Sequence, residues 1–242
     1  MLTVPGSDAL SMEKDRAARA AVRLVKPGMR VALGTGSTAA YAIRALAERF
    51  GPEGRIDTVA TSAMSEELAH QLGLPVRPLV GGDTFDLMID GADEVTPRLE
   101  LTKGGGAALF REKFLARLTR EVVIIVDHTK LVDRLGARCA IPIEVVPYAR
   151  PVLEAGLAAE RYGVALRRRP DGEPLRTENG NEILDLRPPK PLDAPLEFDH
   201  DLRHRPGVVE TGIFVGLAHR VFIGLPDDRI EEVTLPSPPR RA

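Results

Sequence analysis

The sequence contains no tryptophan, and aromatic residues make up only 4% of its 242 residues. Platforms that stack the bases of single-stranded nucleic acid are built from aromatic side chains, so the composition disfavours this class of binding. The 33 basic and 35 acidic residues give a formal net charge of -2, which does not indicate a strongly basic surface for a phosphate backbone. We therefore expect no nucleic-acid partner.

Cysteine is equally scarce, because Cys139 is the one cysteine in the chain. A single thiol cannot form an internal disulfide or a cysteine-based zinc site, which favours a reducing compartment. The longest apolar runs, such as residues 122–126, are far shorter than the roughly 18 residues that a bilayer crossing needs. The N-terminal stretch has no basic region before an apolar run and does not resemble a secretory signal. We expect a cytoplasmic protein without a membrane partner.

The sequence does contain a repeated succession of short apolar runs, each followed by a helical stretch. The expected strands are 29–33, 58–61, 85–89 and 122–126, and the expected helices are 13–24, 39–50, 62–72 and 107–118. The strands are apolar throughout rather than at every second position, which is typical of strands that are covered on both faces. The pattern therefore indicates an α/β core with a mostly parallel sheet.

The pattern changes after about residue 135. The expected elements there are a strand at 141–146, a helix at 149–162, a strand at 163–168, an Asn-Gly hairpin at 179–180, a strand at 182–186 and a helix ending near 204. The apolar runs 211–217 and 220–224 are expected to return to the main sheet. We therefore predict a core formed by residues 1–134 and 207–242, with a small α+β domain at 135–206 inserted before the last strands.

A glycine-rich segment at 34–38 lies between an expected strand and an expected helix. Backbone N–H groups and the helix dipole converge on an anion at such a place, and a phosphate fits it well. Ser37 and Thr38 add hydroxyl donors. The segment lacks the lysine of a P-loop and the spacing of a dinucleotide-binding loop, so neither kind of nucleotide site is supported. A helix cap built from the same residues is the alternative.

Two carboxylates, Asp90 and Asp93, follow the expected strand 85–89, and Gly91 allows a sharp bend between them. Ligands of open α/β sheets bind at the carboxyl ends of the strands, where these side chains can accept hydrogen bonds from sugar hydroxyls. Binding of Mg²⁺ and a purely local turn are the alternatives.

A lysine followed by three glycines, Lys103 and 104–106, precedes the expected helix 107–118. Exposed amides beside an ammonium group suit an oxyanion that develops during a reaction. A flexible loop is the alternative interpretation of this segment.

Glu112 lies on an apolar arc of the same helix, beside Ala108 and Leu115. Loss of solvation there is expected to raise the pKa of the Glu112 carboxyl, as a proton carrier near neutral pH requires. An ion pair with a nearby Arg or Lys is the alternative.

Two further candidates are weaker. Lys130 follows the expected strand 122–126 and could reach an anionic ligand, although a solvated lysine is the commoner outcome. His200 and His204 have the spacing of two metal ligands on one helix face, but no third ligand is evident, so no metal site is predicted.

The segments GTGSTAA at 34–40, DGADEV at 90–95 and KGGGAALFREK at 103–113 occur in this order, and together they closely resemble ribose-5-phosphate isomerases of the A type. The resemblance covers nearly the full length. It implies an aldose-ketose isomerase that interconverts ribose 5-phosphate and ribulose 5-phosphate through an enediolate in the non-oxidative pentose phosphate pathway. It also implies a Rossmann-like core with a small ferredoxin-like lid, a homodimer or homotetramer, and neither a cofactor nor a metal.

The resemblance assigns roles to individual residues. Glu112 is implied as the general base, with Lys103, Gly104, Gly105 and Gly106 stabilising the enediolate. The phosphate and the rest of the substrate are implied to bind at Thr35, Gly36, Ser37, Thr38, Lys14 and Lys130. The sugar hydroxyls and ring opening are implied to fall to Asp90, Gly91, Ala92 and Asp93.

Rival interpretations remain at this point. A related amino-sugar-phosphate deaminase would be expected to carry a ring-opening histidine near Asp90 and Asp93, and none is close in sequence. A CoA transferase of similar architecture is another enzyme alternative. A non-catalytic sugar-phosphate sensor would need a DNA-binding segment or a basic face, for which the chain offers little room.

Overall fold

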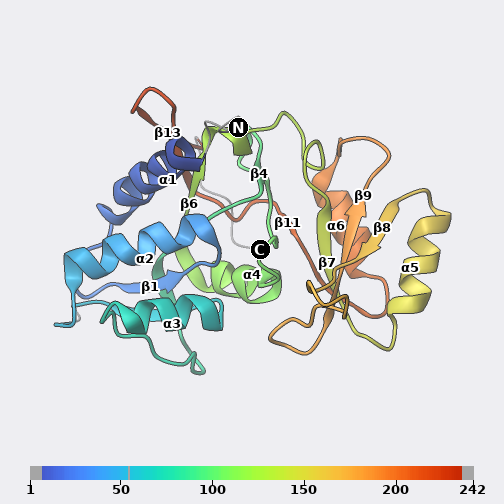
Figure 1. Ribbon diagram of the computed structural model, residues 1–242, viewed down its shortest axis with the longest axis horizontal. Coiled ribbons are helices and arrows are strands. Elements are labelled where there is room, and N and C mark those ends of the chain that lie inside the picture. Colours follow the sequence, from blue (N-terminus) through green and yellow to red (C-terminus); the bar gives the residue numbers. More distant parts are fainter. Residues whose placement is uncertain (1–6, 54, 236–242) are drawn as a thin grey trace. The chain divides into compact units, whose positions relative to one another are not determined.

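The computed structural model describes residues 7–53 and 55–235 (Figure 1). The first six residues of the N-terminal stretch lie outside this range. The chain divides into two compact units. The parallel-sheet unit comprises the described parts of Met1–Ala92, Phe114–Lys130 and Gly216–Ala242, and the antiparallel unit comprises Asp93–Lys113 and Leu131–Val215. The predicted domain boundaries at 134/135 and 206/207 stay a prediction.

The described residues of the parallel-sheet unit contain a six-stranded sheet. Its strands, in spatial order, are β13 (Ile230–Thr234), β12 (Arg220–Gly224), β6 (Thr119–Asp127), β3 (Phe85–Asp90), β1 (Arg30–Leu33) and β2 (Asp57–Ala60). All neighbouring pairs are parallel except β12 and β13. The predicted mostly parallel α/β sheet is therefore confirmed.

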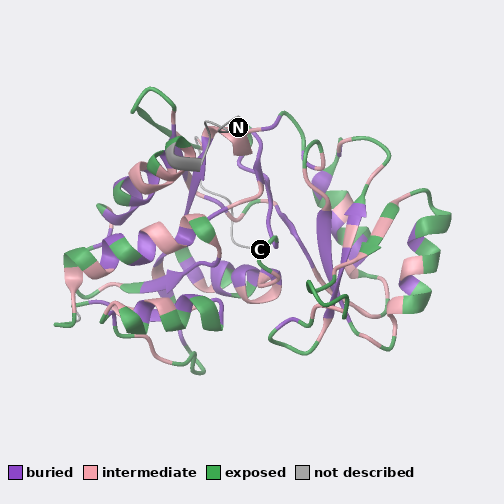
Figure 2. Ribbon diagram, in the orientation of Figure 1, coloured by how far each residue is buried: buried purple, intermediate pink, exposed green. Residues whose placement is uncertain are grey.

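Along the central strands β3 and β6, residues on both faces of the sheet are mostly buried, as the apolar runs 85–89 and 122–126 predicted (Figure 2). Alternate strand residues such as Leu33, Ile89 and Ile125 form one core cluster with side chains of α1 (Ser7–Val22), α2 (Ser37–Phe50) and α3 (Ala63–Gln71). The residues between them, such as Met88, are buried as well. No helix among the described residues is long and apolar enough to cross a membrane.

The strand order contains a switch point between β1 and β3. Strand β1 pairs with the next strand, β2, on one side and with the following strand, β3, on the other side. Leu33 is in register with Ile89, so the loops that follow these two strands start side by side. Ligands of doubly wound sheets bind at such a point, outside the carboxyl ends of the strands.

The antiparallel unit contains a four-stranded sheet with strand order β10-β7-β9-β8. Its elements along the chain are β7 (Ile141–Val145), α5 (Arg150–Ala159), β8 (Gly163–Leu166), β9 (Glu182–Arg187), α6 (Pro195–Arg203) and β10 (Val208–Thr211). This β-α-β-β-α-β succession is that of ferredoxin-like units. Leu157 of α5 and Leu202 of α6 pack with strand residues such as Ile143 in one core cluster. The action of this unit as a lid stays a prediction.

A small antiparallel sheet in the same unit joins β11 (Ile213–Phe214), β5 (Leu101–Thr102) and β4 (Glu94–Val95). The expectation that the whole run 211–217 returns to the main sheet is therefore wrong. Gly212 interrupts the run: its N–H donates to the carbonyl of Pro142, and its carbonyl accepts from the N–H of Lys103. Of the two predicted segments, 220–224 is the one that joins the main sheet, as β12.

Helix α4 (Leu109–Leu118) begins two positions later than predicted. Ala107 has φ of 59°, in the left-handed region, which is incompatible with a helix start at this residue. The amides of the glycine segment therefore belong to a turn that precedes the helix.

Candidate active site

The loop after β1 is bound to the end of β3 through Asp90. The Asp90 side chain is buried, and its Oδ1 accepts hydrogen bonds from the N–H groups of Thr35 (3.1 Å) and Gly91 (2.7 Å). A Cβ atom added to Gly34 would lie 2.2 Å from Asp90 Cγ, so this approach requires glycine. Asp90 thus holds together the two loops at the switch point.

The hydroxyl of Thr35 belongs to a buried polar cluster that the sequence interpretation missed. Its Oγ1 lies 2.7 Å from Thr61 Oγ1 and donates to Ser62 Oγ at 2.7 Å. Ser65 Oγ donates to the carbonyl of Gly34 at 2.7 Å, while Ser62 caps α3. The start of α3 therefore fixes the loop after β1 through these hydrogen bonds. Single hydroxyl residues in a sequence do not reveal such a role.

The N-terminus of α2 has the features of an anion site. Gly36 is its N-cap residue, with φ of 103°, and an added Cβ atom there would meet no heavy atom within 4 Å. Ser37 is exposed, and its Oγ accepts from Lys14 Nζ at 3.4 Å. Helix amides, a hydroxyl and an ammonium group are the donors that a phosphate needs.

The end of β6 adds charged groups to the same unit. Asp127 Oδ2 lies 3.9 Å from Lys14 Nζ, and its Oδ1 accepts from the N–H of Thr129 at 3.0 Å. Lys130 is half-buried at the end of the short helix η1 (His128–Lys130). The buried Glu13 accepts from the ring Nδ1 of His128 at 2.6 Å, a second contact that the sequence interpretation missed.

In the antiparallel unit, Lys103 Nζ lies 3.3 Å from Glu112 Oε1. The two side chains are 3% and 4% exposed. Burial disfavours an isolated carboxylate, but an ammonium group at this distance stabilises it. The alternative of an ion pair for Glu112 is therefore what the structure contains, and its partner is the lysine proposed to act with it.

The turn 104–106 is held by Asp93. Asp93 Oδ2 accepts from the N–H of Gly105 at 2.9 Å, and a Cβ atom at this position would lie 2.9 Å from Asp93 Oδ1. Gly104 has φ of 106° and packs against Pro142. Arg167 donates to the carbonyls of Gly104 (2.7 Å) and Gly105 (3.2 Å). The carboxylate of Asp93 and the guanidinium of Arg167 thus fix the turn after Lys103.

A buried carboxylate between these residues, Glu94, has a structural role. It accepts from Thr102 Oγ1 and from the N–H groups of Gly136, Arg138 and Cys139, at 2.7–3.0 Å. The third acid of DGADEV therefore organises the start of the 131–215 segment rather than contacting solvent.

His200 lies in the last turn of α6, and His204 is the C-cap residue of this helix. The rings of His200 and His204 stack with centroids 4.0 Å apart. Among residues 7–53 and 55–235, no group of three or more His, Cys, Asp or Glu side chains is arranged to hold a metal ion.

The predicted site residues fall into two groups, one in each unit. The parallel-sheet unit carries Lys14, Thr35, Gly36, Ser37, Thr38, Asp90, Gly91, Ala92 and Lys130, and the antiparallel unit carries Asp93, Lys103, Gly104, Gly105, Gly106 and Glu112. Within the first group, the contacts of Asp90 and Lys14 link several members. Within the second, Asp93 binds the turn and Lys103 binds Glu112. Their roles in a reaction stay predictions.

Comparison with known proteins gives a consistent result. Residues 57–228 match the model of the family Ribose 5-phosphate isomerase A (phosphoriboisomerase A). A ribose-5-phosphate isomerase A from Chloroflexus aurantiacus is 47% identical over 91% of this chain and 92% of its own, and one from Deinococcus radiodurans is 44% identical over 91% and 97%.

Solved structures agree. A D-ribose-5-phosphate isomerase in complex with phospho-erythronic acid superposes with a TM-score of 0.89 at 35% identity, covering 93% of this chain and 99% of its own. The ribose 5-phosphate isomerase A of Methanocaldococcus jannaschii gives 0.86 at 36% identity, covering 92% and 98%. From its sequence, its parallel sheet and these likenesses, the chain belongs to the ribose 5-phosphate isomerase A family of isomerases.

Proposed function

We propose that this chain interconverts ribose 5-phosphate and ribulose 5-phosphate through an enediolate, with Glu112 as the proton carrier. The observation that carries the proposal is the buried Lys103–Glu112 pair, with 3.3 Å between ammonium and carboxylate. Membership of the family supports the same reaction. A general base must be ionised to accept a proton, and Lys103 favours that form of Glu112.

In the proposed reaction, Glu112 removes the proton from C2 of the open-chain aldose. The electron pair of the broken C–H bond forms the C1=C2 double bond, and the negative charge moves to O1. The same carboxyl then returns a proton to C1, while the proton of the O2 hydroxyl passes to O1, which gives the ketose. Lys103 stabilises the charge on the enediolate oxygens, a contribution of about 10²- to 10³-fold for one such donor.

The phosphate is proposed to bind in the parallel-sheet unit, at residues 35–38. The amides at the start of α2 and the Lys14–Ser37 contact support this assignment. Lys130 is proposed as a further contact. The proposed roles of Asp90, Gly91 and Ala92 toward sugar hydroxyls are supported by their place at the end of β3 and directly after it, at the switch point of the sheet. Asp93 is proposed for the same role.

The glycines after Lys103 are proposed to present backbone N–H groups to the enediolate. Because the N–H of Gly105 donates to Asp93, this assignment is best supported for Gly104 and Gly106. The proposal gives no role to a metal or a cofactor. A homodimer or homotetramer and a cytoplasmic location also remain proposals.

The experiment is ribulose 5-phosphate formation from ribose 5-phosphate by the purified chain, with and without EDTA, alongside calorimetric titration with phospho-erythronic acid. We expect turnover that EDTA does not change, and binding of the acid. Binding without turnover would contradict the proposal and favour a sugar-phosphate sensor. Turnover abolished by EDTA and restored by a metal would contradict the metal-free mechanism.

A further inference from the structure

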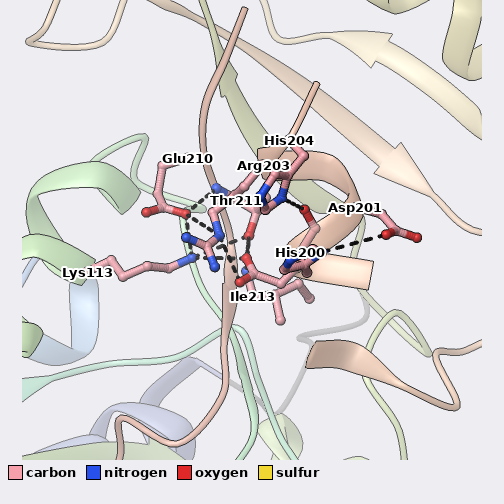
Figure 3. Close-up of polar contacts among 9 residues, drawn as sticks. Lys113, His200, Asp201, Arg203, His204, Glu210, Thr211 and Ile213 are labelled. Atoms are coloured by element: carbon pink, nitrogen blue, oxygen red, sulfur yellow. Dashed lines mark hydrogen bonds and ion pairs between the residues drawn. The ribbon is translucent and has the colours of Figure 1, made fainter. Parts of the chain in front are cut away.

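Lys113 is a buried lysine that the proposed reaction does not use. It directly follows Glu112 on α4, and its side chain is 2% exposed. Its Nζ donates to Glu210 Oε1 at 2.7 Å and to Asp199 Oδ1 and Thr211 Oγ1 at 3.3 Å. Figure 3 shows the Lys113 side chain extending from its helix toward Glu210 and Thr211.

The charges around Lys113 are matched inside the antiparallel unit. Asp199 also accepts from Arg203 Nε at 3.0 Å, so two cations face two carboxylates. Burial lowers the pKa of Lys113, whereas Glu210 and Asp199 act in the opposite direction. Desolvating such a cluster is costly and gives little net stability. The cluster therefore matters more for the position of the chain segment that it binds than for the stability of the fold.

The cluster fixes the chain segment 210–214. Thr211 Oγ1 donates to Asp199 and accepts from the N–H of Ile213 at 3.2 Å. Gly212, between these residues, accepts from the N–H of Lys103 at 2.8 Å. An added Cβ atom at Gly212 would lie 2.3 Å from the Lys103 carbonyl oxygen, so this segment packs directly on the backbone of Lys103.

Phe214 extends the same connection to the side chains. Its buried ring has Lys113 Nζ 4.9 Å and Lys103 Nζ 5.6 Å from its centroid. Both distances are within the range of attraction between a cation and an aromatic ring. These contacts link Lys113 to Lys103 through segment 210–214. Lys103 in turn contacts Glu112, which precedes Lys113 on α4.

We propose that Lys113 is a positioning residue that sets the placement of Lys103 against Glu112 through segment 210–214. The inference rests on the proposed function for the roles of Lys103 and Glu112. Lys113 itself does not contact substrate in this proposal. It joins α4, which carries Glu112, to the strand segment on which Lys103 packs. A displacement of about 1 Å between catalytic groups is enough to cost up to ~10²-fold in rate.

The test compares two double variants, each of which removes one cation and one carboxylate. Lys113→Met/Glu210→Gln removes the ion pair between these two residues and leaves the net charge of the cluster unchanged. Arg150→Met/Glu182→Gln is the matched control, because it removes another pair with a buried carboxylate in the same unit (2.8 Å). Phe214→Leu leaves every charge in place and provides a second route if the first variant does not fold. Unfolding by urea, kcat, KM and the pH profile of kcat/KM are measured for each.

We expect Lys113→Met/Glu210→Gln and Phe214→Leu to lower kcat by about 10- to 100-fold with KM changed less than about threefold. The acidic limb of the profile should move to higher pH, since a displaced Lys103 stabilises the Glu112 carboxylate less. The control should keep the wild-type kcat and profile. Folded variants that keep them too would overturn the positioning role. Failure of the proposed function is a different result: wild type without turnover, or Glu112→Gln with wild-type turnover.

Discussion

Gly34 and Asp90 lie closer together than any side chain at position 34 would permit, with an ideal Cβ only 2.2 Å from Asp90 Cγ. The carboxylate of Asp90 in turn accepts hydrogen bonds from the N–H groups of Thr35 and Gly91. The two loops at the switch point therefore pack this closely because residue 34 has no side chain.

Gly34→Ala is expected to destabilise the fold by about 1–3 kcal/mol, because the added methyl group forces apart a packed backbone and a buried carboxylate. KM for ribose 5-phosphate should rise as the loop moves. Urea unfolding and steady-state kinetics check both effects. Gly156→Ala is the matched control, because Gly156 lies exposed on α5 and an added Cβ atom would have no neighbour within 4 Å. This variant should raise the free energy of unfolding by up to about 1 kcal/mol. Equal stability of the two variants would contradict the account.

Glu94→Gln removes a charge that accepts four hydrogen bonds in a buried setting. Whichever oxygen becomes an NH₂ group, buried donors lose their acceptor, so we expect a loss of about 3 kcal/mol in the free energy of unfolding. Glu154→Gln serves for comparison, since its partly exposed pair with Arg150 should contribute less than about 1 kcal/mol. A Glu94→Gln loss no larger than that of Glu154→Gln would show that this carboxylate does not organise the segment.

Acid should weaken the fold through Asp83. The Arg77 guanidinium donates to both oxygens of Asp83, at 2.7 and 2.8 Å, and lowers the pKa of this carboxyl from 3.8 to about 2. The Asp83 carboxyl binds a proton more readily in the unfolded chain than in the folded one. Its contribution to the free energy of unfolding is therefore present above about pH 4 and is lost as the pH falls toward 2. The gap in urea midpoint between wild type and Asp83→Asn should therefore narrow below about pH 4. A gap that stays constant from neutral pH to about pH 3 would contradict this role of Asp83.

Much of the fold could be predicted because it depends on local patterns. Runs such as 122–126, apolar throughout, indicated a sheet covered on both faces, and the elements alternated as a parallel sheet requires. The run 211–217 was assigned wrongly because apolar residues alone do not say which sheet a strand joins. The hydrogen bonds of Gly212 to Lys103 and Pro142 decide that, and they are long-range contacts.

The candidate site shows the same division. Its segments were visible as glycines, carboxylates and lysines beside expected strand ends or before an expected helix. The partners of these residues were not visible, because the contacts of Lys103 with Glu112, of Thr35 with Thr61 and of Glu13 with His128 each join different elements. Spacing along the chain carries no information about such pairs.

The central claim, proton transfer by Glu112, is tested most directly by following deuterium exchange at C2 of ribose 5-phosphate in D₂O by NMR. Wild type and Glu112→Gln are compared, with binding of phospho-erythronic acid as the check that each variant is folded and holds ligand. We predict exchange and isomerisation by wild type, and loss of both in Glu112→Gln while binding is retained. Exchange by Glu112→Gln at the wild-type rate would contradict the account, because another group would then be carrying the proton.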